Sequence, residues 1–372
     1  MNLREGRIGT RETINVIGIA LLINGMFSID SAKAYANGNS TFISLPLALA
    51  LSGAAFLLIC YAIRRSETVN LHTMLEYSFG KVIGKIITVL VCLALVSLVY
   101  GPLVNILAYL RIMTNDASST AVASFILPVM VALSWMGLET IGRTANCISL
   151  LFLLSIAVII VVAADGYETH RLYPLIGNDV SDIAMFTSSG VFKFLPPLLL
   201  LLSLTGGTQG LGNAKRSGLI ASLIAFVLIT IIQLSIGLTY NYTELQRMSI
   251  PFSQISMLTE TLGIRFDRFA SMIWLIGTIL TCSFYIYGSS FLYAKCFNQR
   301  DIRPITICIG TAAILVCTGS DNISKTFESA SGLINLIPDL GFAILLIPLA
   351  AASIVAIIKS VRSDKKKRNE AA

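Results

Sequence analysis

The 372-residue sequence has few charged residues and few of the groups from which enzyme sites are built. Charged residues make up 13% of the chain, about half the roughly 25% that is typical of soluble domains. Only two histidines occur, His72 and His170, and they lie far apart in the sequence. No nucleophile with a nearby base can be recognised. The sequence therefore predicts no catalytic centre, no metal site and no cofactor.

The sequence also contains no CxxC motif and no phosphate-binding loop motif. The seven cysteines include no CxxC pair, and most lie in or beside apolar segments, as small packing residues do. The stretch GGTQGLGNAKRS at 206–217 is rich in glycine, but it lacks the GxxxxGK[ST] spacing of a phosphate-binding loop. We interpret it as a turn, and we expect a protein that is not an enzyme.

Apolar residues are abundant instead, at 55% of the chain. The runs at 42–63, 149–164 and 218–238 approach or exceed the roughly 20 residues with which a helix crosses a bilayer. A helix pairs its backbone amides within one segment, and the short alternating strands of a membrane barrel are not seen. The N-terminal stretch MNLREGRIGTRE lacks the features of a removed signal peptide. The fold class is therefore predicted to be an all-α polytopic membrane protein.

Breaks at glycine, proline and charged residues divide the apolar sequence into about ten spans, five in each half. The expected spans lie near 12–30, 42–63, 83–112, 119–137 and 141–164, then near 187–207, 217–240, 267–293, 303–318 and 333–359. We expect a single transmembrane domain over 1–372, with a first repeat at about 12–164, a second at about 187–359 and a basic tail at 360–372.

Two amphipathic stretches support the division into halves. They lie at 69–85 and 251–263, each before the third span of its half and on opposite faces of the membrane. An inverted repeat places corresponding connections in this way. The layout alone predicts the repeat, because no residue-level identity between the halves is evident.

Positive charges predict the orientation. With the N-terminus inside, 19 of the 27 lysines and arginines fall in cytoplasmic segments. By the positive-inside rule, the chain is predicted to be a multi-pass inner-membrane protein with both termini in the cytoplasm. The net charge of +7 thus reports topology, and no nucleic-acid partner is predicted. The lipid bilayer is the expected surrounding, and the basic tail KSVRSDKKKR is suited to contact with anionic headgroups.

Several segments, taken in their order and spacing, resemble the spore germination receptor B-subunit family, a branch of the amino acid, polyamine and organocation permease superfamily. The matching segments are YANGNSTFISLPLALALSG, VNLHTMLEYSFGKVIGKIITVL, GLETIGRTANCISLLFLLSI, RLYPLIGNDVSDI and GIRFDRFASMIWLIG. The resemblance implies a leucine-transporter-like 5+5 inverted repeat with interrupted helices 1 and 6. It also implies a nutrient germinant receptor subunit in the spore inner membrane, with A-type and C-type subunits as partners and a small nutrient, an amino acid, as ligand.

In the implied fold, an amino acid lies near the midplane, where interrupted helices expose backbone groups. Span 1 carries INGMFSID, in which Gly25 permits close approach of the backbone. Span 6 carries FKFLPPLLL, in which two prolines remove amide donors, although an ordinary kink is the alternative for either motif. The ligand-binding candidates from these spans are Asn24, Gly25, Phe27, Phe194, Pro196 and Pro197.

Spans 3 and 8 contribute aromatic and polar side chains to the expected pocket. The candidates are Tyr100, Asn105, Trp274 and Thr278. Tyr285 and Tyr287 suit the pocket and suit interfacial anchors equally. Relatives in the resembled family often place a carboxylate near the position of Asn105. The amide here argues against a cationic ligand and against proton coupling at this site.

Charged groups inside the expected membrane region are scarce. No aspartate or glutamate is placed at the centre of a span, whereas a proton-driven transporter usually needs a titratable group on its path. Lys193 is the deepest cation, and extension toward the outer surface is the favoured interpretation, with a mimic of a coupling cation and a partner for a carboxylate ligand as alternatives. Glu139 and Arg143 are spaced for an ion pair within one helix, with an intracellular gate as the alternative.

Three hypotheses follow for the function. The first is a germinant receptor subunit that binds a nutrient between spans 1, 3, 6 and 8 and signals to partner subunits. The second is an ion-coupled amino acid permease. The third is a scaffold or ion-conducting subunit without a ligand of its own. The missing carboxylates favour the first, and the permease-like layout is compatible with the second.

Reporter fusions test the predicted topology. Fusions after Gly166, Tyr242 and Ser320 should report the outer side, because the charges of the flanking segments orient each span. Fusions after Gly212, Gln299 and Lys367 should report the cytoplasm. A reversal at any position between span 6 and span 10 would exclude the ten-span arrangement.

Overall fold

The structure is a computed structural model, and it describes residues 6–28, 40–114, 119–173, 180–245, 247–248, 250–258, 266–318 and 347–362. The helices are α1 (Thr10–Met26), α3 (Thr41–Arg65), α4 (Leu71–Phe79), α5 (Lys81–Ser97), α6 (Tyr100–Thr114), α7 (Ser119–Met136), α8 (Leu138–Ala163), α9 (Val180–Ser203), α10 (Leu211–Thr239), α11 (Tyr242–Leu245), α12 (Pro251–Met257), α13 (Phe266–Cys296) and α14 (Arg303–Thr318), with a further helix over 347–362 and two short 3-10 helices, η2 (Ala164–Gly166) and η3 (Thr169–Leu172).

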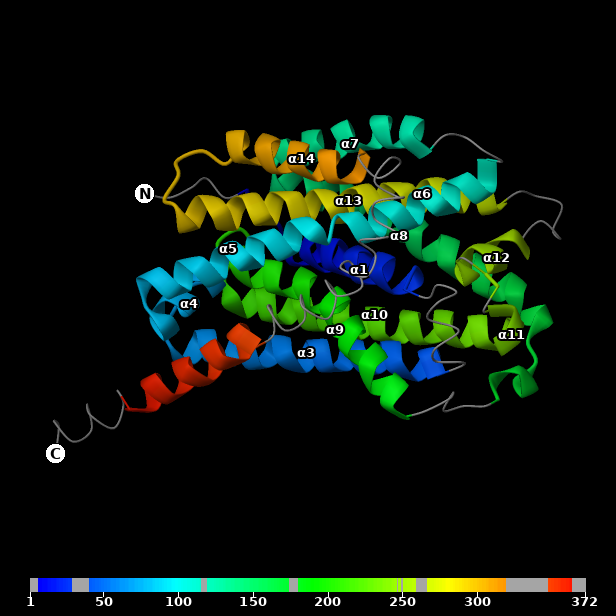
Figure 1. Cartoon of the computed structure of the whole chain (residues 1–372), viewed down its shortest axis with the longest axis horizontal. Helices are drawn as coiled ribbons and strands as arrows, with labels where there is room; N and C mark the ends of the chain where they lie inside the picture. The colour runs from blue at the N-terminus through cyan, green and yellow to red at the C-terminus, as the bar shows by residue number, and fades with distance from the viewer. Residues whose placement is uncertain are drawn as a thin grey trace.

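All regular structure in the described residues is helical, which confirms the predicted fold class. Six of the described segments are long and apolar enough to cross a bilayer: Thr41–Arg65, Lys81–Leu110, Leu138–Gly166, Ile183–Ser203, Leu211–Thr239 and Phe266–Cys296. The long helices run side by side along the long axis of the molecule (Figure 1). Large apolar side chains are exposed on their outer faces, as expected where a helix faces lipid.

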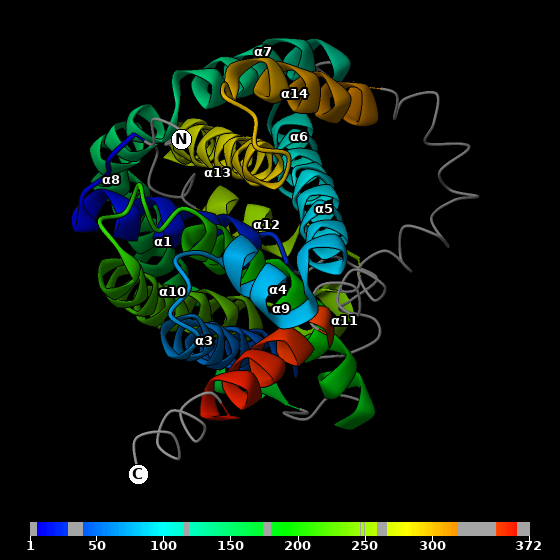
Figure 2. The ribbon, with the colours of Figure 1, turned by 90° about the vertical axis from the view of Figure 1, so that its left-hand side faces the viewer.

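The helices form two groups that interlock through α1. One group contains α1, α3, α9 and α10, and the other contains α5, α6, α7, α13 and α14. Each group therefore combines corresponding spans of the two halves: spans 1 and 2 with 6 and 7, and spans 3 and 4 with 8 and 9. Helix α1 passes through the middle and contacts α8, α9, α10 and α13, whereas α7 and α14 pack together on the outside (Figure 2).

The segments predicted to be cytoplasmic meet at one end of the bundle. The amide of Ile8 donates to the carbonyl of Gly207, at 2.9 Å, and the hydroxyl of Thr205 donates to the carbonyl of Val69, at 2.8 Å. The N-terminal segment, the connection after α3 and the turn after α9 are thereby joined. Lys359 of the 347–362 helix donates to two carbonyls of α4 at the same end.

Close helix crossings rely on small residues. A Cβ atom added to Gly190 of α9 would lie 2.6 Å from the Cβ of Ala48 on α3, and one added to Gly288 of α13 would lie 2.3 Å from Leu200 on α9. Small residues let membrane helices approach closely and gain van der Waals contact, the main attraction between helices when lipid surrounds them. These crossings fix how α9 sits between α3 and α13.

The interruptions differ from those implied by the resemblance. Helix α1 ends at Met26, inside the expected span 12–30, as an interrupted helix 1 requires. The interruption expected at Pro196 and Pro197 is wrong, because α9 continues through both prolines to Ser203. Span 3 is interrupted instead: α5 ends at Ser97 and α6 begins at Tyr100. Pro102 has no amide hydrogen to offer the carbonyl of Leu98, which favours a break at this point.

The packing of Gly25 generates a stability prediction. A Cβ atom at Gly25 would lie 2.6 Å from Cδ1 of Ile229 on α10. We expect Gly25→Ala to destabilise the protein by about 1–3 kcal/mol through overpacking. Combining it with Ile229→Ala should cost less than the sum of the two single changes, since the second change makes room for the first. Thermal unfolding in detergent, followed by tryptophan fluorescence, measures both effects.

Gly18→Ala is the matched control on the same helix. A Cβ atom there meets no other atom within 4 Å, so this change should be neutral or stabilising. Equal destabilisation by Gly18→Ala and Gly25→Ala would contradict the packing role of Gly25.

Candidate ligand site at the end of helix α1

The end of α1 lies inside the bundle, and side chains from other helices satisfy its carbonyl groups. The last carbonyls of a helix have no partner within the helix. The carbonyl of Gly25 accepts from Nε2 of Gln233 on α10, at 3.3 Å. The carbonyl of Phe27 accepts from Nδ2 of Asn105 on α6, at 3.2 Å, and that of Asn24 accepts from the hydroxyl of Ser28. The buried amide of Gln233 and the partly buried amide of Asn105 thus act in place of the water that would cap an exposed helix end.

Asn24 connects α1 to both α9 and α13. Its Nδ2 donates to the carbonyl of Lys193, at 3.0 Å, and to the hydroxyl of Tyr285, at 2.8 Å. In an uninterrupted helix, the carbonyl of Lys193 would accept from the amide of residue 197, but Pro197 has no amide hydrogen. Asn24 supplies the missing donor, so α9 remains helical through the proline pair. The prolines therefore create an acceptor for α1 rather than a break.

A cavity of about 200 Å³ adjoins this junction. It lies between α1, the interruption of span 3 and α9, and its lining residues are Ile23, Asn24, Ser97, Leu98, Tyr100, Gly101, Pro102, Asn105, Phe192 and Lys193. Two amides, two hydroxyls and one lysine face an otherwise apolar wall. No aspartate or glutamate is among these lining residues.

An aromatic cluster closes the end of α1 on the side away from the N-terminus. Phe27, Tyr109, Trp274 and Phe252 are all buried, and Trp274 lies 5.4 Å from Tyr109 and 5.0 Å from Phe252 between ring centroids. Trp274 Nε1 donates to the hydroxyl of Ser155, at 3.0 Å, so its polar group is paired as well. Because Phe252 belongs to the short helix α12, this helix covers the cluster.

The structure brings together some of the predicted site residues and separates others. Asn24, Tyr100 and Asn105 line the cavity, and Phe27 and Trp274 lie in the adjoining aromatic cluster. The other five lie outside the cavity lining: Gly25 packs on α10, Phe194, Pro196 and Pro197 are buried within α9, and Thr278 donates to the carbonyl of Trp274 in its own helix.

The placement of Phe194 corrects the prediction in span 6. Phe192 and Lys193 line the cavity, whereas the side chain of Phe194 is fully buried elsewhere. Phe194 lies one turn beyond Gly190, whose face packs against Ala48 of α3. The prediction assumed unwound backbone at the prolines. In a continuous helix, the face that carries Phe194 turns toward α3.

Sequence reasoning missed one residue near the site, Gln233, and left the places of Tyr285 and Lys193 open. Gln233 is the only amide side chain in the apolar stretch ASLIAFVLITIIQLSIGL, which is a signal for a buried polar contact. Tyr285 was considered either a pocket residue or an interfacial anchor, and it is fully buried and accepts a hydrogen bond from Asn24. For Lys193, extension toward the outer surface was the favoured interpretation, and it lines the cavity.

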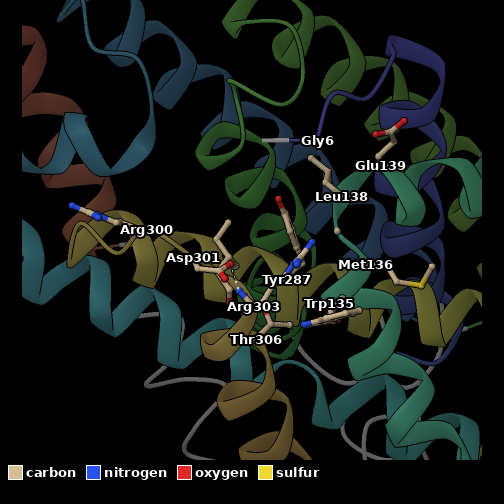
Figure 3. A pocket seen from close by; sticks show the side chains of 13 residues that line it. Gly6, Trp135, Met136, Leu138, Glu139, Tyr287, Arg300, Asp301, Arg303 and Thr306 are labelled. Atoms are coloured by element: carbon tan, nitrogen blue, oxygen red, sulfur yellow. Dashed lines mark hydrogen bonds between the residues drawn. The ribbon is translucent and has the colours of Figure 1, made fainter. Parts of the chain in front are cut away.

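A second cavity, of about 420 Å³, opens at the end of the bundle that holds the N-terminal segment (Figure 3). Tyr287, the turn between α7 and α8, and the start of α14 contribute to its wall. The guanidinium of Arg303 lies 5.2 Å from the centre of the Trp135 ring. The predicted pair of Glu139 and Arg143 forms within α8, and both side chains are exposed, as in the ion pair within one helix that the spacing predicted.

The described residues contain no group of three or more histidine, cysteine, aspartate or glutamate side chains that could hold a metal ion. The two cavities also differ in character. The lining of the first includes three of the predicted ligand-binding residues, Asn24, Tyr100 and Asn105, whereas the lining of the second includes none of the ten. The first is therefore the candidate ligand site.

Solved structures with the same arrangement are transporters of low sequence identity. A Na⁺-coupled sialic acid symporter, in a substrate-bound outward-open state, matches with 12% identity and a TM-score of 0.67 over 95% of this chain and 90% of that chain. Mhp1, a nucleobase-cation-symport-1 family transporter in a closed conformation with bromovinylhydantoin bound, matches with 11% identity and a TM-score of 0.59 over 98% and 94%. A manganese transporter of Eremococcus coleocola matches with 11% identity and a TM-score of 0.55 over 95% and 75%.

These similarities show the fold, which is the 5+5 inverted-repeat transporter fold that the resemblance implied. No curated protein matches the sequence significantly. The profile of the family described as "Spore germination protein" matches residues 7–326, which is most of the chain. The chain therefore belongs to the spore germination protein family, as a multi-pass membrane protein with a permease-like fold and not an enzyme.

Proposed function

We propose that this protein is the membrane subunit of a spore nutrient germinant receptor and that it binds a small nutrient, an amino acid, in the cavity beside α1. The cavity itself carries the proposal, because it combines Lys193, two amides and two hydroxyls with no carboxylate among its lining residues. Its volume of about 200 Å³ is below the roughly 300–1,000 Å³ of typical drug-sized pockets. A ligand of amino acid size suits this space.

The charges around the cavity suit both ends of an amino acid. Lys193 and the amides of Asn24 and Asn105 are suited to a carboxylate. The carboxyl end of α1 carries partial negative charge, which favours an ammonium group. Gln233 lies beside this end, and its buried Oε1 has no hydrogen-bond partner among the residues that the structure describes. An ammonium group that approaches α1 would find this acceptor in addition to the helix carbonyls.

Signalling follows from the contacts that a ligand would change. Asn24 donates to α9 and α13 from a single amide group, so a ligand that engages this amide competes with both contacts. A ligand shifts a conformational equilibrium only by its differential affinity for the two states. In this proposal, the ligand alters the position of α1 against α9, and the A-type and C-type receptor subunits in the spore inner membrane receive the change.

An ion-coupled amino acid permease is the second candidate. The fold is shared with ion-coupled transporters, and the carbonyls at the end of α1 resemble the oxygen ligands that a sodium ion requires. Proton coupling has less support, since the lining residues include no carboxylate. The receptor and the permease differ in one measurable property, concentrative uptake.

Amide removal tests the ligand site. Asn24→Ala and Asn105→Ala should each raise the amino acid concentration for a half-maximal germination response about three- to tenfold, which corresponds to the roughly 0.5–1.5 kcal/mol of one hydrogen bond. A panel of the standard amino acids, applied to intact spores, provides the dose–response curves. Asn15→Ala is the matched control, because Asn15 is an amide on the same helix that pairs with Asn146 away from the cavity. Equal shifts for all three variants would place the site elsewhere.

Reconstitution separates the receptor from the permease. Purified protein in liposomes should bind the amino acid that triggers germination, and it should show no concentrative uptake under an imposed proton or sodium gradient. Asn24→Ala liposomes provide the background for both measurements. Gradient-dependent accumulation of the amino acid above that background would contradict the receptor proposal and support the permease.

A further inference from the structure

A groove runs along the outer face of α5, at the end of the bundle that is predicted to be cytoplasmic. Its volume is about 450 Å³, and its lining residues are Lys81, Val82, Lys85, Ile86, Val89, Leu90 and Phe297. Residues four apart share one side of a helix. The groove therefore has two rows, one of Lys81, Lys85 and Val89 and one of Val82, Ile86 and Leu90. Its head is basic, and its remaining length is apolar.

The basic head has no anionic partner in the described part of the chain. No carboxylate of a described residue pairs with Lys81 or Lys85. The nearest acidic residue on α4, Glu76, is directed to Nε2 of His72, at 3.6 Å. Helix α5 also begins here, directly after Gly80, and no side chain caps it. Its first amides add partial positive charge beside the two ammonium groups.

The apolar residues of the groove are exposed, as are those on the other outward-facing helix surfaces. Val82 is 73% exposed, Ile86 56% and Phe297 47%. The segment Lys81–Leu110 is long and apolar enough to cross the membrane, so Val82 and Ile86 belong to its first turns. Extension of lysine side chains to the headgroup layer would explain the two charges. It would not explain a hollow that continues below them.

We propose that this groove binds one anionic glycerophospholipid of the inner leaflet. The phosphate lies between Lys81 and Lys85 at the start of α5, and an acyl chain lies along Val82, Ile86 and Leu90 against Phe297. Charge complementarity selects an anionic over a zwitterionic headgroup. The site is separate from the cavity beside α1 and shares no residue with it. It is therefore independent of the proposed germinant.

Phospholipid titration of the detergent-solubilised full chain tests the site. Native mass spectrometry should show one bound phosphatidylglycerol and markedly less phosphatidylcholine with the same acyl chains. The double variant Lys81→Gln and Lys85→Gln should weaken phosphatidylglycerol binding about thirty-fold, from roughly fivefold for each lysine. The matched control is Lys215→Gln with Arg216→Gln, which removes two exposed cations of α10 at the same end of the bundle. This control should retain binding.

Two further measurements separate a lipid from a free phosphate or a nonspecific annulus. Ile86→Trp keeps both lysines and fills the apolar row, and it should also weaken phosphatidylglycerol binding. Glycerol 3-phosphate at millimolar concentration should not displace the lipid. The proposal is overturned if the two double variants lose equal affinity, if phosphatidylcholine binds as tightly, if Ile86→Trp has no effect, or if glycerol 3-phosphate competes fully.

Discussion

The arrangement of helices around the end of α1 depends on one missing backbone amide hydrogen, that of Pro197 in α9. Pro197 leaves the carbonyl of Lys193 without its helical donor, in a bundle whose surroundings provide no water. An unsatisfied buried acceptor costs about 1–3 kcal/mol, so the donor must come from another helix. Asn24 supplies it and so fixes the end of α1 against α9 and α13. The cavity lies beside this junction, and Asn24 belongs to both.

The same junction accounts for the sensitivity that a receptor needs. The carbonyls at the end of α1 are held by single side chains, Gln233 and Asn105, rather than by a regular helix. Each contact is replaceable by a ligand group of the same kind. Elsewhere, the bundle is held by close crossings through small residues, which tolerate little change. A replaceable polar centre within a rigid frame lets a small molecule alter one helix position without loss of the fold.

The amino-acid sequence predicted much of the architecture because its main signals are long. Apolar runs extend over many residues, so the six long apolar segments of the described residues could be predicted, and helices α4 and α12 lie within the two predicted amphipathic stretches. The errors arose where a single residue determines whether a helix continues. A proline pair was expected to break span 6, but the acceptor it created found a donor in Asn24, 169 residues away. A single proline, Pro102, marks the interruption of span 3 instead.

The candidate site was predictable in type but not in detail. Asn24, Tyr100 and Asn105 were recognised because polar residues are rare in apolar helices, and Gln233 carried the same signal without being used. Phe194 was misplaced since the side that a residue faces depends on whether its helix is continuous. Tyr285 could not be assigned to the pocket or to an anchor, because sequence distance from a span end is a poor guide to burial. Long-range hydrogen bonds settled each of these points, and no local pattern encodes them.

The partners of Asn24 also impose an order on biosynthesis. Helix α1 is made first, but the hydroxyl of Tyr285 that it contacts follows 261 residues later. At roughly 5–20 residues per second, α1 waits about 13–50 s in the membrane before that partner is translated. During this interval, the amide of Asn24 faces lipid, other early helices or the insertion machinery. During synthesis, the unpaired amide of Asn24 therefore delays the docking of α1. Until Tyr285 is made, the nascent protein depends on other contacts to satisfy this amide.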